Sequence, residues 1–311
     1  MATTPKIGIL YTGGTIGMAP TAQGLAPSAN LAALAAPYLL DCQVEWHIYT
    51  PLIDSSAVNL HHWQDWLTWV AEHLDAYDGL LILHGTDTMA YTANILALAQ
   101  PNLTKPIVLT GAQWPLQQAH SDAPLNLQTA LAALTLPGFH QVAIAFHGQL
   151  WRAVGSSKVS TESIDGFATP HFPSLGKWQP ENKWSHLKLH TLPAPDDQMQ
   201  KQPNTSSIIQ ENVRIHSFVF TPGANIDMIT TVLTQQPADG VVLQTYGHGN
   251  VPTHPGLMKA IQAATHQARP YSTSVKCHRD ALRPCMLKAM LYWVLASSMG
   301  VNAIWKRQQP Y

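Results

Sequence analysis

The chain has 311 residues, of which 46% are hydrophobic and 11% charged, and its 17 basic and 18 acidic residues leave a formal net charge of −1. A charge this balanced excludes a basic nucleic-acid groove or an acidic tail as the dominant feature. The length predicts two domains, and the hydrophobic content is enough to give each a core. No hydrophobic run approaches the length of a membrane span, and the first residues do not resemble a secretory signal, so we expect a cytoplasmic protein.

The cysteines and histidines provide no metal-binding motif. Cys42, Cys277 and Cys285 are an odd number without a C-x-x-C pair, which is typical of a reducing compartment. The sixteen histidines are scattered and include no H-E-x-x-H, so we expect them to be solvated or hydrogen-bonded. The sequence therefore predicts no metal site.

Short hydrophobic runs alternate with helical patterns in the first half of the chain. Strands are predicted at residues 6–11, 44–49, 79–83, 106–110 and 142–146. Between the second and third of these, one helical face is marked by Trp63, Trp66, Leu67, Val70 and Leu74. This alternation predicts an α/β fold with a mostly parallel sheet flanked by helices. Ligands of such sheets bind beyond the carboxyl ends of the strands, so the loops there are the place to look for chemistry.

The second half of the chain predicts a smaller domain. Residues 187–207 are rich in proline and polar residues and are interpreted as a linker between a larger N-terminal domain, residues 1–186, and a smaller C-terminal α/β domain, residues 208–311. Strands are predicted at residues 215–220 and 240–245, with helices near residues 224–233 and 254–264.

Two loops after predicted strands carry hydroxyl and carboxyl groups. The first, residues 12–17, reads T-G-G-T-I-G, and its glycines allow a ligand to approach the backbone. A phosphate-binding loop is one interpretation, but the glycine–lysine pattern of such loops is missing. The second loop, residues 84–88, reads H-G-T-D-T, and its alternative interpretation is a helix N-cap formed by Thr86, Asp87 or Thr88.

Four segments together resemble one enzyme family. They are YTGGTIGM at residues 11–18, HGTDTMAYTA at 84–93, LTGAQWPL at 109–116 and SDAPLNL at 121–127. They are similar to the bacterial L-asparaginases, particularly the cytoplasmic type I group, and the resemblance extends from about residue 6 to residue 270. It implies hydrolysis of L-asparagine to L-aspartate and ammonia through a threonine acyl-enzyme, with no metal or organic cofactor. Glutamine differs by one methylene, so glutaminase activity stays open.

The resemblance also implies which residues are catalytic. Thr15 resembles the nucleophilic threonine of the family, and Thr86, Asp87 and Lys158 resemble its second triad. A threonine nucleophile needs a base, and the charge of a lysine beside Asp87 would help Thr86 or a water molecule to remove a proton.

Further residues resemble the family's substrate-binding groups. Asp54, Ser55 and Ser56 match the loop that grips the substrate, together with Thr86 and Asp87. Asn250 resembles an asparagine that a neighbouring subunit contributes, so a homodimer or homotetramer is implied.

Two positions depart from the family pattern. Leu25 stands where the family commonly has a lid tyrosine whose hydroxyl lies near the nucleophile. Ala123 replaces a glycine, which matters only if that position needs a positive φ.

The resemblance stops at Pro270. Residues 271–311 have one interpretation as a diverged C-terminal helix, but they look frameshifted. Reading each codon one base earlier forces Leu at Trp293, Gly at Val294, Gly at Gly300 and Glu at Lys306, and none of these contradicts the family pattern. A tail of this kind would deprive the small domain of its last native strand and helices, and the hydrophobic segment 286–296 that replaces them would expose hydrophobic surface.

Two other functions stay open beside L-asparaginase. One is a catalytically impaired or inactive member of the family, produced from a frameshifted gene, that still binds dicarboxylic amino acids. The other is a related glutaminase or an amidotransferase subunit, which is weakened because no extra domain precedes the asparaginase motifs.

Overall fold

A computed structural model describes residues 4–266 and 271–275, except for residues 22–23, 28–29, 101, 171, 190–208, 210–212, 237 and 247–248. The predicted linker lies almost entirely outside the described residues. The chain divides into two compact units, residues 1–207 and residues 208–311, and each is described by itself.

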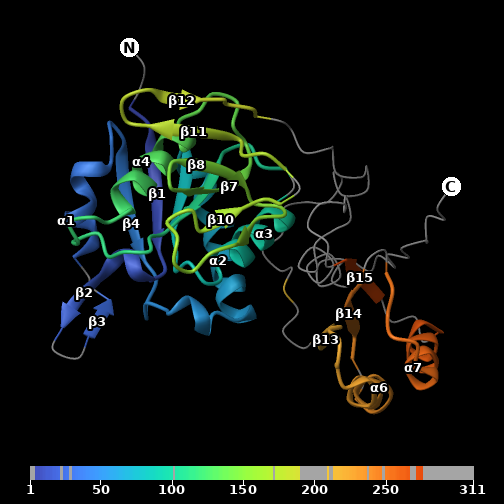
Figure 1. The fold of residues 1–311 in the computed structure, drawn as a ribbon. Coiled ribbons are helices and arrows are strands. Elements are labelled where there is room, and N and C mark those ends of the chain that lie inside the picture. The colour runs from blue at the N-terminus through green and yellow to red at the C-terminus, as the bar shows by residue number, and fades with distance from the viewer. Residues whose placement is uncertain are drawn as a thin grey trace. The chain divides into compact units, whose positions relative to one another are not determined.

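An eight-stranded sheet forms the centre of the larger unit (Figure 1). Its strand order is β12-β11-β8-β7-β6-β5-β1-β4. The strands are β1 (Lys6–Tyr11), β4 (Gln43–Ile48), β5 (Gly79–Leu83), β6 (Ile107–Thr110), β7 (Val142–Phe146), β8 (Gln149–Arg152), β11 (Gly176–Gln179) and β12 (Lys183–Ser185). The five strands from β7 to β4 are parallel to one another. They are the five strands expected from the sequence, so that prediction of a mostly parallel sheet is confirmed.

Helices cover both faces of this sheet. On one face, alternate residues of β1, such as Ile7 and Ile9, share a hydrophobic cluster with Leu31 of α1 (Leu31–Ala35) and Leu131 of α4 (Ala123–Leu134). The other face is covered by α2 (Leu60–His73) and α3 (Met89–Ala99) (Figure 1). Trp66, on the predicted face of α2, is fully buried.

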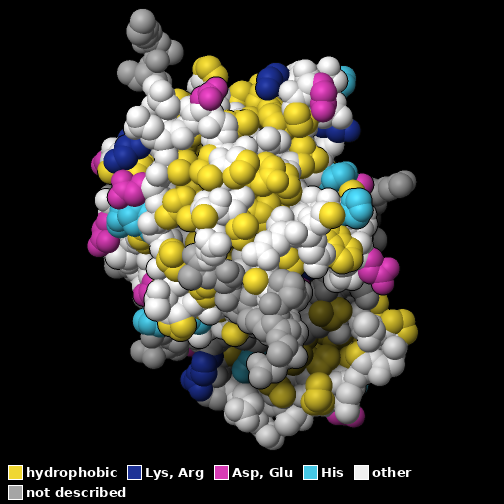
Figure 2. Space-filling view, turned by 90° about the vertical axis from the view of Figure 1, so that its left-hand side faces the viewer, with side chains coloured by type: hydrophobic (Ala, Val, Ile, Leu, Met, Phe, Trp, Pro, Cys, Tyr) yellow, Lys and Arg dark blue, Asp and Glu magenta, His cyan; other side chains and the backbone are white. Residues whose placement is uncertain are grey.

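Strand β4 is one edge of the sheet. The side of the molecule on which α1 and β4 lie carries many hydrophobic side chains at its surface (Figure 2). On β4 the side chain of Ile48 is 48% exposed, and Val44 and Trp46, which lie on the same face of the strand, are half-buried. An exposed hydrophobic area of this kind is typical of an interaction surface.

The antiparallel part of the larger unit was not predicted. Strands β8, β11 and β12 continue the sheet beyond β7 in antiparallel pairs. Two small hairpins stand apart from it, one formed by β2 (Met18–Thr21) and β3 (Gly24–Pro27), the other by β9 (Ser157–Lys158) and β10 (Phe167–Ala168). These strands of two to four residues have at most two large hydrophobic residues in a row, whereas the equally short β6 has three, and this is why sequence patterns miss them.

The smaller unit has a three-stranded parallel sheet in the order β13-β14-β15. Its elements are β13 (Ile215–Val219), α6 (Ile226–Gln235), β14 (Gly240–Thr245), α7 (Pro255–His266) and β15 (Tyr271–Val275). Phe220, Ile229, Leu243 and Leu257 belong to its core. The predicted strands and helices of this domain are therefore present.

Strand β15 begins the tail that looks frameshifted. The expectation that the tail removes the last strand is wrong, because residues 271–275 pair with β14. Tyr, Thr and Val are strong strand formers, and the free edge of β14 gives such a segment a partner for its backbone. The rest of the tail, including Cys277 and Cys285, lies outside the described residues, and the frameshift stays a prediction.

Within the described ranges, no helix is long and apolar enough to cross a bilayer. The same residues contain no group of three or more His, Cys, Asp or Glu side chains placed to hold a metal ion.

Candidate active site

Four loops meet beyond the carboxyl ends of the parallel strands. The backbone N–H and the hydroxyl of Thr12 both donate to the Leu83 carbonyl, each at 3.0 Å, and this ties the loop after β1 to the end of β5. The N–H of Ile53 donates to the Thr12 carbonyl at 2.8 Å, which adds the loop after β4. The N–H of Leu116 donates to the Ile16 carbonyl at 3.1 Å, which adds the loop after β6.

Glycines allow these loops to pack backbone against backbone. Gly13 and Gly14 have φ of +130° and +93°, in the region that favours glycine. A Cβ on Gly14 would lie 2.5 Å from the Cα of Gly85, and a Cβ on Gly85 would lie 2.5 Å from the Oγ of Ser55. The two sequence motifs and the Asp54–Ser56 segment are thus in direct contact.

Thr15 opens a short 3-10 turn, Thr15–Gly17, directly after Gly14. Its side chain is neither fully buried nor fully exposed. Because Gly14 touches Gly85, Thr15 is held close to the second loop, which carries Thr86 and Asp87.

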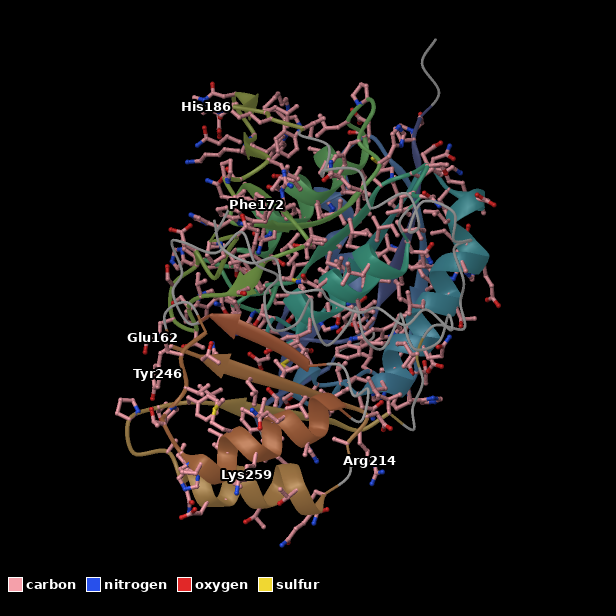
Figure 3. The ribbon with its side chains drawn as sticks, turned by 90° about the vertical axis from the view of Figure 1, so that its right-hand side faces the viewer. Glu162, Phe172, His186, Arg214, Tyr246 and Lys259 are labelled. Atoms are coloured by element: carbon pink, nitrogen blue, oxygen red, sulfur yellow. The ribbon has the colours of Figure 1, made fainter. Side chains whose placement is uncertain are left out.

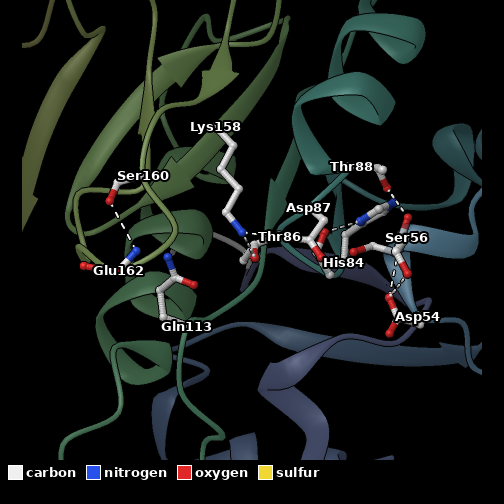
Figure 4. A network of polar contacts seen from close by, with 12 residues as sticks. Asp54, Ser56, His84, Thr86, Asp87, Thr88, Gln113, Lys158, Ser160 and Glu162 are labelled. Carbon is white, nitrogen blue, oxygen red and sulfur yellow. Dashed lines mark hydrogen bonds and ion pairs between the residues drawn. The ribbon is translucent and has the colours of Figure 1, made fainter.

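Lys158 joins the second loop from a distant part of the chain (Figure 4). Its Nζ lies 2.9 Å from the Thr86 Oγ1 and 2.7 Å from the Asp87 Oδ1. The Lys158 side chain is only 15% exposed and that of Asp87 is 59% exposed. The structure therefore brings together the three residues of the predicted second triad, with the cation on the protected side of the pair.

The Asp54–Ser56 segment is a rigid turn. The Asp54 Oδ1 accepts from both the N–H and the hydroxyl of Ser56 at 2.8 Å, and these hydrogen bonds lower the pKa of the Asp54 carboxyl. Ser55 is buried, and its carbonyl accepts from the Thr88 hydroxyl at 2.7 Å. The alternative of a side-chain N-cap is wrong: Thr88 holds the N-cap position of α3, but no side chain caps it, because the Thr88 hydroxyl is bonded to Ser55.

His84 holds the second loop in place through hydrogen bonds of its buried ring, a role that the sequence did not indicate. The ring is buried, and burial lowers the pKa of His84 to about 4, so the ring is neutral at pH 7. Its Nδ1 lies 2.7 Å from the Gly85 carbonyl and its Nε2 lies 2.9 Å from the Thr92 Oγ1. A carbonyl can only accept, so Nδ1 carries the proton and the Thr92 hydroxyl donates to Nε2. The indole N–H of Trp63 donates to the same hydroxyl at 3.0 Å.

Asp122 performs a similar task for the loop after β6. Its carboxylate accepts from the N–H groups of Gln113 and Trp114 at 3.0 Å and from the Asn126 Nδ2 at 2.9 Å. Asn126, which is fully buried, also donates to the Gly111 carbonyl at 2.9 Å. The sequence contains a signal for this pair, since an Asp and an Asn four residues apart on a helix lie on the same side of it and can form a hydrogen bond.

The two departures from the family pattern lie in ordinary backbone. Ala123 is the first residue of α4 and is buried, and it is not among the described residues with a positive φ, so the position tolerates a Cβ. Leu25 lies in β3 of the first hairpin, opposite Pro20.

Asn250 belongs to the smaller unit. It lies just after β14, where its N–H and carbonyl bond to the Tyr246 backbone, and it is exposed (Tyr246 is labelled in Figure 3). The structure therefore presents Asn250 at the surface of its own unit.

The doubly covered α/β sheet carries at its strand ends a threonine that follows two glycines, and on the adjoining loop a threonine and an aspartate bonded to a lysine. These are the features of a hydrolase that acts through an activated hydroxyl. Comparison with protein families makes the class specific, because residues 6–191 match the model of the asparaginase N-terminal domain. The chain belongs to the asparaginase family.

Individual relatives agree with this membership. L-asparaginase 1 of Escherichia coli K12 is 36% identical over 271 residues, which cover 84% of this chain and 76% of that protein. The crystal structure of L-asparaginase I from Vibrio cholerae is 30% identical, with a TM-score of 0.68 and coverage of 85% of this chain and 79% of that one. The thermostable L-asparaginase from Thermococcus kodakarensis is 27% identical, with a TM-score of 0.75 and coverage of 93% and 87%.

Proposed function

We propose that this protein is an L-asparaginase, an amidohydrolase that converts L-asparagine and water to L-aspartate and ammonia. The observation that carries the proposal is the meeting of Lys158, Thr86 and Asp87 beside the loop that bears Thr15. Membership of the asparaginase family supports the same reaction.

In the proposed mechanism Thr15 is the nucleophile. Its Oγ attacks the side-chain amide carbon, the carbonyl oxygen becomes an oxyanion, and backbone N–H groups of the loops stabilise the charge. The C–N bond then breaks and ammonia leaves with the proton that Thr15 gave up. A water molecule hydrolyses the acyl-enzyme, releases L-aspartate and restores the Thr15 hydroxyl.

Lys158, Thr86 and Asp87 serve the proton transfers. The Lys158 ammonium donates to both partners, so it stabilises negative charge that develops on Thr86 or on a water molecule bound there. Most of this cation is shielded from solvent, which strengthens its field at the reacting atoms.

Asp54, Ser55 and Ser56 are proposed to hold the substrate's α-amino and α-carboxyl groups, together with Thr86 and Asp87. The Asp54 carboxylate, whose pKa the hydrogen bonds from Ser56 lower further, is ionised at neutral pH, as recognition of an ammonium group requires. Because glutamine is longer by one methylene, which is worth about 1–3 kcal/mol in a pocket, a smaller glutaminase activity is expected.

The protein is further proposed to act in the cytoplasm as a homodimer or homotetramer, with Asn250 completing the site of a neighbouring subunit. The exposed hydrophobic side chains on the β4 side are in keeping with an assembly. Mixing inactive Thr15→Ala and Asn250→Ala chains should restore part of the activity, because some sites then receive an intact copy of both residues. No recovery from chains that assemble normally would contradict the shared site.

The experiment that tests the proposed function measures ammonia release from L-asparagine and L-glutamine. The parent chain should be active, Thr15→Ala should lose at least about a thousandfold in kcat, and Thr135→Ala, an exposed threonine on the far end of α4, should leave it unchanged. Full activity in Thr15→Ala would reject the nucleophile.

A catalytically impaired protein is the second candidate, and the observation that favours it is Leu25 in place of the lid tyrosine. An inactive parent whose thermal midpoint rises with L-aspartate would identify this candidate, because only a ligand that binds the folded state raises the midpoint.

A further inference from the structure

Asn94 is a buried polar residue in an otherwise hydrophobic part of helix α3. It is 2% exposed, and its neighbours Ala93, Ile95 and Leu96 are buried hydrophobic residues. A buried amide is costly unless its hydrogen-bonding groups find partners, so the partners of Asn94 show what it does.

Two of those partners, Gly155 and Ser156, lie about 60 residues away in sequence, on the turn that precedes Lys158. The Asn94 Oδ1 accepts from the Gly155 N–H at 3.0 Å. Its Nδ2 donates to the carbonyl of Ala90, one helical turn back, at 2.6 Å and contacts both the carbonyl and the hydroxyl of Ser156 at 3.4 Å. Gly155 offers a donor and Ala90 an acceptor, so only one orientation of the amide satisfies both.

The turn held in this way has a defined shape. The N–H of Ser156 donates to the carbonyl of Ala153 at 3.0 Å, and Gly155 has φ of +85°, as at the third residue of a type II turn. The N–H of that residue takes no part in the turn's own hydrogen bond, so it is available to Asn94. Lys158 follows Gly155 by three residues and is paired with Phe167 on β10.

Helix α3 links the hydrogen bonds between Asn94 and the 153–156 turn, called the clamp below, to Thr86 and Asp87, the two partners of Lys158. The helix begins at Met89 with Thr88 as its N-cap, so Thr86 and Asp87 lie in the loop just before it, and Asn94 stands five residues after Met89, about 7.5 Å along the axis at 1.5 Å per residue. The groups that bond to the Lys158 ammonium therefore lie just before the start of α3, and the amide that holds the backbone of the Lys158 segment lies within the same helix.

We propose that Asn94 is a positioning residue for Lys158. It fixes the turn from which Lys158 extends, and thereby holds the ammonium at 2.9 Å from Thr86 and 2.7 Å from Asp87. This inference rests on the proposed function of Lys158 in proton transfer. Asn94 itself touches neither substrate nor reacting atoms.

The test replaces Asn94 by leucine, whose side chain has the same number of heavy atoms and branches at the same carbon but has no hydrogen-bonding groups. The matched control is Thr129→Val on α4, which likewise removes a buried helical hydrogen bond, from Thr129 to the Leu125 carbonyl, without touching the Lys158 segment. Ser156→Ala, which weakens the clamp from the other side, is a milder second variant in case Asn94→Leu does not fold. Three quantities are measured: the rate of amide hydrogen exchange of the segment 153–158, and kcat and KM for L-asparagine.

In Asn94→Leu, amide hydrogen exchange of segment 153–158 should become faster and kcat should fall about ten- to a hundredfold, while KM stays within about twofold of the parent value. Ser156→Ala should show the same changes less strongly. Thr129→Val should change neither. In a Lys158→Met background the Asn94 substitution should lower kcat by less than about twofold further, because two residues that act through one group are not additive.

Unchanged exchange of segment 153–158 in a folded Asn94→Leu protein would overturn the inference. So would an equal loss of kcat with and without Lys158. An inactive parent would instead reject the proposed function, and the positioning of the Lys158 segment would then stand or fall on hydrogen exchange alone.

Discussion

The contact between Gly14 and Gly85 predicts that Gly14→Ala is damaging for two separable reasons. Gly14 has φ of +93° and ψ of 170°, a region that almost only glycine adopts, and a side chain there costs about 1–3 kcal/mol. The new Cβ would also lie 2.5 Å from the Gly85 Cα and 2.6 Å from its nitrogen, and since these are backbone atoms they cannot rotate away. Forcing an extra carbon into a packed site costs about 1–3 kcal/mol more.

Gly138→Ala separates the two effects. Gly138 lies in the same unit with φ of +72°, but a Cβ built there meets no atom within 4 Å. This control suffers only the backbone strain, partly offset by about 0.4–1 kcal/mol because alanine restricts the unfolded chain. Gly14→Ala should therefore be less stable than Gly138→Ala by about 2 kcal/mol, or about 4–8 °C in the thermal midpoint of the larger unit.

The assay is thermal unfolding of the parent and both variants followed by circular dichroism, with ammonia release measured in parallel. Gly14→Ala should also lose activity, because the loops that bear Thr15 and Thr86 are pushed apart, whereas Gly138→Ala should stay active. Equal midpoints for the two variants would refute the reasoning, since they would mean that the loops separate without cost.

Three further predictions concern stability. Burial holds the pKa of His84 at about 4 against 6.5 in the unfolded chain, so between these pH values the unfolded state binds more protons than the folded state. The free energy of unfolding of the parent should therefore fall by about 3 kcal/mol as the pH falls from 7 to 4. In His84→Asn this part of the decrease should be absent from urea midpoints measured across the same pH range. Asp122→Asn should lower the free energy of unfolding, measured in urea at pH 7, by about 2 kcal/mol, because an amide cannot accept all the hydrogen bonds that the carboxylate accepts from Gln113, Trp114 and Asn126. A decrease below about 0.5 kcal/mol would contradict this prediction. Asn59→Ala should lower the same free energy of unfolding by about 1 kcal/mol, because the Asn59 side chain caps α2 by accepting from the N–H groups of His61 and His62. An unchanged urea midpoint would show that water replaces the cap.

The parallel part of the fold could be predicted because most of its strands are runs of buried hydrophobic residues. β1, β5 and β7 have the bounds that their hydrophobic runs predict, since a strand covered on both faces is hydrophobic throughout. The strand β8, with alternating half-buried residues, and the two-residue β9 have no such signal. Their pairing depends on tertiary contacts that a local pattern does not contain.

The candidate site was predictable where short motifs carry it, and not where buried polar residues support it. Thr15, Thr86 and Asp87 stand in glycine-containing loops at strand ends, and Lys158 followed from family resemblance alone. Asn94 and His84 belong to hydrophobic surroundings in which a polar residue has no meaning until its partner is known. The helix sequence MAYTANILALA did contain one clue, since an asparagine between Ala93 and Ile95 must be satisfied from outside the helix.

The loops around Gly13, Gly14, Gly85 and Gly111 meet largely through main-chain atoms and form the floor of the site. This has a consequence for how the protein can evolve. Every amino acid has the same backbone, so exchanges among the surrounding side chains can alter specificity or rate while the floor keeps its shape. Adding a single carbon at Gly13, Gly14, Gly85 or Gly111 would bring it within 2.2–2.5 Å of an atom of a neighbouring loop. In a library of all single substitutions, these four positions should accept nothing but glycine, within a site whose other residues vary more freely.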